Sequence, residues 1–216
     1  MNDKYYFLGG GGFALELYEY MLSDGVKVEG YYGQEDNKEL SEFIPWMGDI
    51  DKVEDDKLDK YAYYIVAVRL LKYREKMFDT IQKRGLKAGT YISKKAYFSK
   101  IAQIGNGAVI FPFAMVSGNA KADEYLFMDT YSIISHGDVI GRNVVVGPAA
   151  VITGDCIIGD NVTFGVNSAV LPGTKIGDNT EIAINTYPQR RVAADSRIIS
   201  MPGKNFGINL NRNFKN

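Results

Sequence analysis

The chain has 216 residues, of which 46% are hydrophobic, enough for one large domain or two small ones with a buried core. Its formal net charge is −1 and its Lys and Arg residues form no block, so a nucleic-acid-binding surface is not expected. The first residues lack a basic stretch followed by an apolar run, and the sequence predicts no signal peptide, no membrane span and a cytoplasmic location.

The first part of the chain predicts an α/β unit. Residues 4–8 read as a strand that ends in four glycines, Gly9–Gly12, and a helical pattern follows. Further strands are expected over residues 26–32 and 61–68, and a second helix over residues 73–84. Strand, glycine turn, helix and strand make the first half of a Rossmann-like nucleotide-binding unit, whose turn lets the backbone approach a phosphate. A tight turn without a ligand is the alternative interpretation.

The second part of the chain is a repeat. From Ile92 to Ile182 every sixth residue is apolar, and the residue four positions later is usually small or β-branched. A period of six fits neither an α-helix, about 3.6, nor a β-strand, about 2. It predicts a triangular coil with one short strand per side, in which residue i stacks on residue i+18. No coil buries its inward row alone, so neighbours must stack. Cys156 occupies a small-residue position and is expected to be a buried, inert thiol.

These patterns divide the chain into three parts. We expect an α/β nucleotide-sugar-binding domain over residues 1–90 and a β-helix over residues 91–204. Residues 205–216 form a polar tail that we expect to be partly disordered.

Motifs in both parts point to one family. They are the glycine turn, the hexads, the stretch ISHGDVIG and a closing segment with Val192, Ser196, Pro202 and Lys204. Their combination resembles the hexapeptide-repeat sugar acetyltransferases of the sialic-acid O-acetyltransferase and bacillosamine N-acetyltransferase group. The resemblance implies a left-handed parallel β-helix that binds acetyl-CoA and an α/β unit that holds a nucleotide-linked sugar. It also implies a homotrimer, with active sites in the clefts between adjacent prisms.

His136, the only histidine, matches the catalytic position of this family. It follows the inward Ile134 by two residues, so its side chain is expected to point outward. An imidazole, with a pKa of about 6.5 in model peptides, suits a general base that takes a proton from an acceptor amine.

Relatives typically carry Asp or Glu directly after the histidine, where this chain has Gly137. Stacking places Gly137 on Asp155, so Asp155 is the expected orienting carboxylate and Asp138 the second candidate. A solvated turn residue is the alternative for Asp155.

The donor site is expected beside this histidine. Stacking places Gly154 beneath His136, where its N–H suits the stabilisation of an oxyanion. The resemblance implies that Val166 and Ile184 line the pantetheine channel, although Ile184 and Asn185 replace the usual glycines. The nearest cations for the CoA phosphates are Arg190, Arg191 and Lys204, for each of which a solvated surface charge is the alternative.

The acceptor site is expected in the α/β unit. The family's nucleotide-cradling turn is matched by Gly11, Gly12 and Phe13. The positions of its carboxylate pair are occupied by Gly33 and Gln34, with Glu35 and Asp36 just beyond. Arg69 replaces a common glycine and is expected either to pair with a diphosphate or to cap a strand end.

The leading interpretation is acetyl-CoA-dependent N-acetylation of a nucleotide-linked amino sugar in surface-glycan biosynthesis, by direct attack. The first alternative is O-acetylation of a sugar hydroxyl, as in the sialic-acid branch. The second is a non-catalytic sugar-nucleotide-binding scaffold, because Gly137 replaces a carboxylate and Val145 replaces a histidine that some relatives carry. One histidine argues against a zinc hydratase built on the same prism, and no metal site is predicted.

Overall fold

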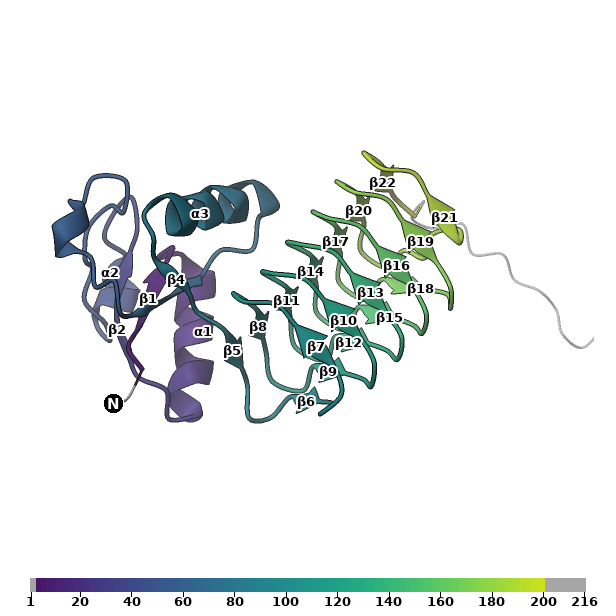
Figure 1. Cartoon of the computed structure of the whole chain (residues 1–216), viewed down its shortest axis with the longest axis horizontal. Coiled ribbons are helices and arrows are strands. Elements are labelled where there is room, and N and C mark those ends of the chain that lie inside the picture. The colour runs from purple at the N-terminus through teal and green to yellow at the C-terminus, as the bar shows by residue number, and fades with distance from the viewer. Residues whose placement is uncertain (1–2, 201–216) are drawn as a thin grey trace, which may run out of the picture.

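The structure is a computed structural model that describes residues 3–200 (Figure 1). A small N-terminal α/β unit is followed by a parallel β-solenoid of the left-handed type, so the predicted β-helix is confirmed. Lys204 and the expected tail, residues 205–216, lie outside the described residues.

The α/β unit is built on four parallel strands in the order β2-β1-β3-β4. The strands are β1 (Tyr5–Leu8), β2 (Val28–Tyr32), β3 (Tyr63–Val66) and β4 (Lys87–Ala88). The helices are α1 (Gly12–Ser23), α2 (Lys38–Ser41) and α3 (Leu71–Lys83), with a 3-10 turn η1 at Asp55–Lys57. The sequence predicted neither α2 nor β4, because elements of four and two residues carry no periodic pattern.

The solenoid consists of two-residue strands that form three parallel sheets, one on each side of a prism. Face I comprises β5 (Tyr91–Ile92), β8 (Val109–Ile110), β11 (Phe127–Met128), β14 (Val145–Val146), β17 (Thr163–Phe164), β20 (Glu181–Ile182) and β22 (Arg197–Ile198). Face II comprises β6 (Tyr97–Phe98), β9 (Met115–Val116), β12 (Ile133–Ile134), β15 (Val151–Ile152) and β18 (Ala169–Val170). Face III comprises β7 (Gln103–Ile104), β10 (Lys121–Ala122), β13 (Val139–Ile140), β16 (Ile157–Ile158), β19 (Lys175–Ile176) and β21 (Arg191–Val192).

The strand register follows the predicted spacing of 18 residues. Ile134 pairs with Val116 on one side and Ile152 on the other, and all three are buried in the prism core. The strands continue past Ile182, where the hexad pattern ends, because a shorter last coil pairs Ile176 with Val192. The inward row of apolar side chains is therefore continuous along the prism.

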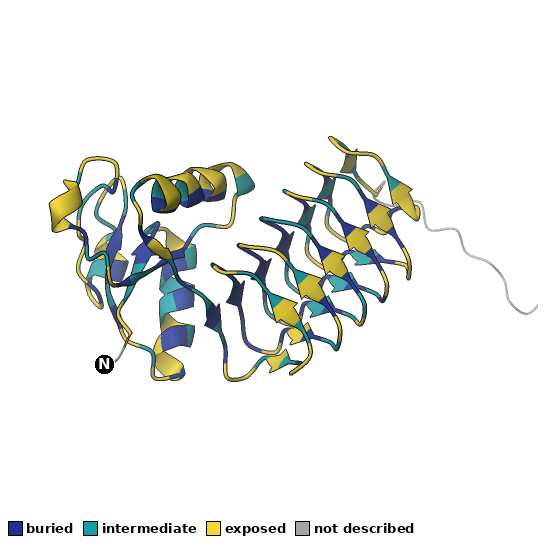
Figure 2. Ribbon diagram, in the orientation of Figure 1, coloured by how far each residue is buried: buried dark blue, intermediate teal, exposed yellow. Residues whose placement is uncertain are grey.

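The outward side chains of face I hold the α/β unit. Tyr91, Val109, Phe127 and Val145 are spaced by 18 residues, are buried, and share one apolar cluster with residues of α1. Figure 2 shows these strands of the prism buried where they face the α/β unit. The next outward residues of the same column are polar, beginning with Thr163. The α/β unit thus covers the part of face I whose outward residues are apolar.

We expect Phe127→Ala to lower the free energy of unfolding by about 3 kcal/mol, because a buried aromatic side chain between two parts of one core is lost. The Phe127 ring lies edge-on to the rings of Phe13 and Phe111, with centroid distances of 5.1 Å for both pairs. Urea denaturation measures the change. Tyr97→Ala is the control, because Tyr97 is 61% exposed on face II. Equal losses for both variants would contradict a shared core.

Candidate functional site

His136 lies on the corner that joins face II to face III. Its side chain is 73% exposed and its ring lies over Gly154 of the next coil. A Cβ atom on Gly154 would come within 2.7 Å of Nε2 of His136, closer than real contacts allow. Glycine at position 154 is therefore what permits the imidazole to lie flat on the neighbouring coil.

Asp155 is the carboxylate beside this ring. Its Oδ1 atom lies 4.0 Å from Nδ1 of His136, and its backbone N–H donates to the carbonyl of His136 at 3.0 Å. Gly137 has a positive φ of 70°, and a Cβ there would collide with the Asp155 carboxylate. The absence of a side chain at Gly137 thus makes room for a carboxylate that comes from the next coil.

Asp138 has a different environment from Asp155. It occupies a small-residue position of the repeat and is fully buried. Its two carboxylate oxygens accept hydrogen bonds from the backbone N–H groups of Ser135, at 2.8 Å, and Cys156, at 2.9 Å. Burial raises the pKa of the Asp138 carboxyl to about 7, although these two donors favour the charged form. Its contacts hold the backbone at Ser135, directly before His136, and at Cys156 in the next coil, while the Asp155 carboxylate lies beside the ring itself.

The glycine turn joins β1 to α1 at the carboxyl edge of the sheet. Gly11 and Gly12 are exposed, and a Cβ at either position would meet nothing within 4 Å. Their lack of side chains leaves open space above the N-terminus of α1, which suits close approach of a phosphate. The side chain of Phe13 points elsewhere: it stacks on Phe111 of the prism at 5.5 Å, so only its backbone is available to a ligand at the turn.

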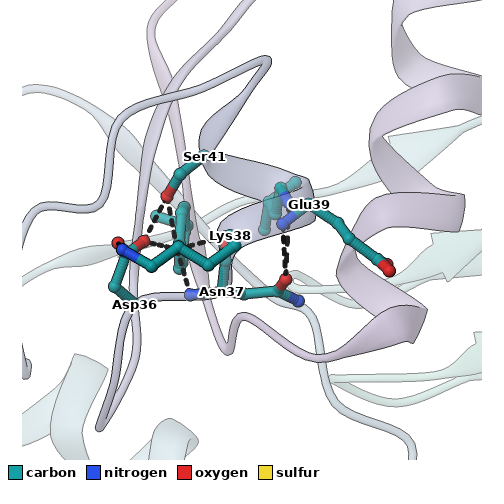
Figure 3. A network of polar contacts seen from close by, with 7 residues as sticks. Asp36, Asn37, Lys38, Glu39 and Ser41 are labelled. Atoms are coloured by element: carbon teal, nitrogen blue, oxygen red, sulfur yellow. Dashed lines mark hydrogen bonds and ion pairs between the residues drawn. The ribbon is translucent and has the colours of Figure 1, made fainter.

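A polar network ties the loop after β2 to the glycine turn (Figure 3). The side chain of Asn37 caps α2 through its oxygen and donates from Nδ2 to the carbonyl of Gly10 at 2.6 Å. Asp36 accepts hydrogen bonds from Tyr31 and Ser41, and the Ser41 bond, ahead of Lys38 and Tyr31, lowers the pKa of its carboxyl. The carboxylate of Asp36 therefore has structural partners within its own loop.

The two predicted residues before this network are placed differently. Gly33 uses both backbone groups, donating its N–H to Gly48 at 3.1 Å and accepting at its carbonyl from the indole of Trp46 at 3.0 Å. Gln34 is exposed beside it. The structure thus brings Gly33 and Gln34 to the same edge as the glycine turn, and only Gln34 presents a free side chain there.

Arg69 follows β3 and reaches the prism. Its Nη2 atom lies 3.0 Å from Oδ2 of the buried Asp129, and its guanidinium lies about 6 Å from the ring centroids of Phe13 and Phe127. That Asp129 oxygen has no aligned hydrogen-bond donor within residues 3–200. The charge of Arg69 is therefore partly balanced inside the protein.

Arg74, on α3, was not singled out by the sequence. It is completely buried, and its guanidinium donates to Oδ1 of Asn143 at 2.9 Å and to the carbonyls of Val68 at 3.1 Å and Tyr125 at 2.6 Å. Burial lowers the pKa of its guanidinium to about 9, so the group stays charged at neutral pH. An arginine on the apolar side of an amphipathic helical pattern is the sequence feature that would have marked it.

The residues expected at the pantetheine channel lie on the corner between face I and face II. Val166 and Ile184 are exposed, at 45% and 62%, and lie one coil apart. Asn185 stacks above Asn167, whose Nδ2 donates to its Oδ1 at 2.7 Å. These side chains form an exposed strip along the prism axis, on a different corner from Gly154. Arg190 and Arg191 are also exposed near the end of the described chain.

Residues 3–200 contain no group of three His, Cys, Asp or Glu side chains that could hold a metal ion. Cys156 is buried, and burial raises the pKa of its thiol. Among the described helices, none is long and apolar enough to cross a membrane.

Comparison with known proteins identifies the repeat. The sequence model of the family described as "Bacterial transferase hexapeptide (six repeats)" matches residues 155–186. Residues 155–186 carry the bacterial transferase hexapeptide repeat. The hexapeptide-repeat chain is also 28% identical over 92 residues to GDP-perosamine N-acetyltransferase from Escherichia coli O157:H7. That alignment spans 43% of this chain and 42% of the relative's length.

Solved acetyltransferase structures resemble the hexapeptide-repeat chain along most of its length. The acetyltransferase domain of PglB from Neisseria gonorrhoeae, in complex with acetyl coenzyme A, has a TM-score of 0.79 and 18% identity, covering 91% of this chain and 96% of that one. PerB from Caulobacter crescentus, in complex with CoA and GDP-perosamine, has a TM-score of 0.82 and 21% identity, covering 96% and 99%. At these identities the likeness shows a shared fold.

We expect Asp138→Asn to change how stability depends on pH. The folded-state pKa of Asp138 is raised to about 7, against about 3.9 in an unfolded chain. The folded state therefore binds the proton more tightly, and this contribution to the free energy of unfolding is present below about pH 4 and declines as the pH rises to about 7. An asparagine side chain binds no proton in this pH range, so the free energy of unfolding of the variant should lack this decline.

The measurement is urea denaturation of both proteins at pH 5 and pH 8. The stability of Asp138→Asn relative to the unmodified protein should be higher at pH 8 than at pH 5 by about 2 kcal/mol. Asp155→Asn is the control, because it makes the same change at an exposed carboxylate in the next coil. Parallel curves for Asp138→Asn and the unmodified protein would contradict a buried, proton-binding carboxyl.

Proposed function

We propose that this protein is a cytoplasmic acetyl-CoA-dependent N-acetyltransferase that acts on a nucleotide-linked amino sugar in surface-glycan biosynthesis. The observation that carries the proposal is an exposed imidazole, on a hexapeptide-repeat prism, that lies over Gly154 with the Asp155 carboxylate beside Nδ1. Support comes from the curated relative, which acetylates GDP-perosamine by its name, and from solved neighbours that hold acetyl coenzyme A or CoA with GDP-perosamine. The Rossmann-like residues 1–90 would hold the acceptor and residues 91–204 the donor.

The residues around His136 are suited to moving one proton. Acetyl-CoA supplies the acetyl group as a thioester that an amine can attack. Nε2 of His136 accepts the proton that the attacking amine loses, and Asp155 favours the tautomer with its proton on Nδ1. The N–H of Gly154 makes no hydrogen bond within residues 3–200, and we assign it to the carbonyl oxygen as negative charge develops there. The proton leaves with the sulfur of the departing thiol.

Asp155 fits the orienting role better than Asp138. The Asp155 carboxylate is solvent-exposed and lies within 4.0 Å of the ring nitrogen, so a small rotation of either side chain makes a hydrogen bond. Both oxygens of Asp138 are already occupied by backbone donors. Asp138 therefore supports the corner on which the histidine stands.

The proposed acceptor and donor parts cannot meet within one chain. The glycine turn belongs to the unit that packs on face I, whereas His136 stands on the corner between face II and face III. A homotrimer would bring the two parts together if the histidine of one copy completes the acceptor site of the next. Exposed apolar side chains flank the histidine corner and suit contact between copies, namely Met115, Val139 and Ile157.

His136→Ala should lower kcat by about a hundredfold or more and leave the affinity for acetyl-CoA nearly unchanged, because the base acts on the acceptor proton. Release of free thiol from acetyl-CoA measures turnover, with a panel of nucleotide-linked amino sugars as acceptors. A gain of one acetyl group, read by mass spectrometry, identifies the acceptor.

Two carboxylate variants serve as comparisons. Asp155→Asn should lower kcat by about tenfold, because the imidazole loses the carboxylate that orients it, whereas Asp138→Asn should act mainly on stability. Full turnover by His136→Ala would refute the general-base assignment. A loss confined to Asp138→Asn would refute the role of Asp155.

Mixing two inactive variants tests whether each site is shared between copies. Gly12→Trp fills the open space at the glycine turn and His136→Ala removes the base, so each protein alone should be inactive. Co-refolded in equal amounts, they should recover roughly a quarter of the wild-type activity, because that fraction of subunit pairs joins two intact halves. Mixing without refolding is the control. No recovery, despite mixed trimers by mass, would place each complete site within one chain.

A further inference from the structure

A cavity of about 500 Å³ lies where α3 overhangs face I. One wall is formed by the start of α3 and the residues before it, including Arg69, Leu71 and Lys72. The prism provides the opposite wall through Asn161, Thr163 and Asn179. This is the point at which the outward column of face I changes from apolar to polar, since the buried Val145 is followed by Thr163. The volume falls within the range of about 300–1,000 Å³ that small-molecule sites occupy.

A ladder of asparagine side chains runs along this wall of the prism. Asn143, Asn161 and Asn179 occupy the same corner of successive coils, all with positive φ near 55°, which asparagine tolerates well. Nδ2 of Asn143 donates to Oδ1 of Asn161 at 2.9 Å, and Nδ2 of Asn161 donates to Oδ1 of Asn179 at 3.3 Å. The ladder ends where Nδ2 of Asn179 donates to Oδ1 of Asp195 at 3.0 Å.

The two ends of the ladder fix its direction. Arg74 can only donate, and its Nε donates to Oδ1 of Asn143 at 2.9 Å. Ionised Asp195 can only accept. Every amide between them must therefore turn its oxygen toward Arg74 and its NH2 group toward Asp195. Each NH2 group has a second N–H, so Asn161 and Asn179 offer donors of known orientation at the cavity wall.

The same arginine also holds the opposite wall. Arg74 donates to the carbonyl of Val68, directly before Arg69, and to the carbonyl of Tyr125 in the prism. Its three acceptors are neutral oxygens from three separate segments, which the fixed fork of a guanidinium can bind together and an ammonium on a flexible stem cannot. One buried side chain thus determines both the spacing of the cavity walls and the direction of the amides.

The lining favours a neutral, hydroxylated ligand. The charged residues of the lining are two cations, Arg69 and Lys72, and two carboxylates, Glu75 and Glu181, so their formal charges cancel. Two of these residues are also paired, Arg69 with Asp129 and Glu181 with Arg197 at 3.2 Å. Amides, hydroxyls and carboxylates bind sugar hydroxyls, and leucine side chains at the mouth suit the apolar edge of a sugar ring. Arg69 lies about 6 Å from the ring of Phe13, so the cavity and the glycine turn share one edge of the sheet.

We propose that this cavity binds the sugar ring of the nucleotide-linked acceptor, and that Arg74 is a positioning residue that orients its amide donors. The inference rests on the proposed function, which places the nucleotide at the glycine turn. The reacting amine would then lie at the edge of the cavity, where only a histidine from another copy can reach it.

Calorimetric titration of the full chain tests the cavity. The probes are GDP and UDP, each compared with its hexose conjugate. For the preferred base, the conjugate should bind at least about tenfold more tightly than the free diphosphate, since each factor of ten is about 1.4 kcal/mol. Thr163→Val and Asn161→Asp should reduce the ratio of the affinity for the conjugate to the affinity for the free diphosphate to about one, and leave the affinity for the free diphosphate unchanged. Asn119→Asp is the control, because it makes the same change at a positive φ of 60° on another corner.

Arg74→Lys tests the positioning role. It should remove the advantage of the hexose conjugate without changing the affinity for the free diphosphate, a separation that a general loss of structure would not produce. If Arg74→Lys does not fold, Asp195→Asn frees the exposed end of the ladder and should lower the same ratio.

Equal binding of diphosphate and conjugate by the unmodified protein would overturn the proposal, as would an unchanged ratio in both Thr163→Val and Asn161→Asp. Absence of acetyl transfer, with the ratio intact, would remove the proposed function and leave the sugar site standing. Acetyl transfer by the unmodified protein, together with an unchanged affinity ratio in both Thr163→Val and Asn161→Asp, would remove the sugar site and leave the proposed function.

Discussion

The prism depends on one contact, the parallel pairing of each strand residue with the residue 18 positions further along the chain, a spacing that shortens to 16 in the last coil. That pairing stacks apolar side chains inside the prism and repeats each corner in register. It also brings together side chains that are distant in sequence, such as His136 with Gly154 and Asp155. The site at this corner is a direct result of the ladder, because residues 18 positions apart in the chain lie only one strand spacing, about 4.8 Å, from each other.

The α/β unit is held on the prism by two kinds of contact. An apolar column on face I, which includes Phe127, shares a core with α1. Next to it, the buried Arg74 joins α3 to the corner at Asn143 through directional hydrogen bonds. Apolar burial supplies most of the attraction and the arginine fixes the relative position of the two parts, since hydrophobic contact has little directionality. The glycine turn of the α/β unit is thereby held at a set distance from the prism.

Two carboxylates near one imidazole have been given different environments. Asp155 is exposed and free to turn toward the ring, whereas Asp138 is enclosed and holds two backbone N–H groups. Their difference follows from the repeat: position 138 is an inward corner for small side chains and position 155 is an outward turn. A carboxylate directly after the histidine would collide with the Asp155 carboxylate, so Gly137 leaves the space that Asp155 uses.

The sequence by itself determined the prism, the outward direction of His136 and its neighbours in the next coil. In a repeat of fixed period, residues that contact each other across coils lie a fixed number of positions apart in the chain. It also determined the glycine turn and the order of the main helices and strands. Only the tertiary structure decided the pairing of Arg69 with Asp129, the buried position of Arg74 and the cavity beside Asn161. These depend on how α3 lies across face I, and no periodic pattern records the packing of a non-repeating unit on a repeating one.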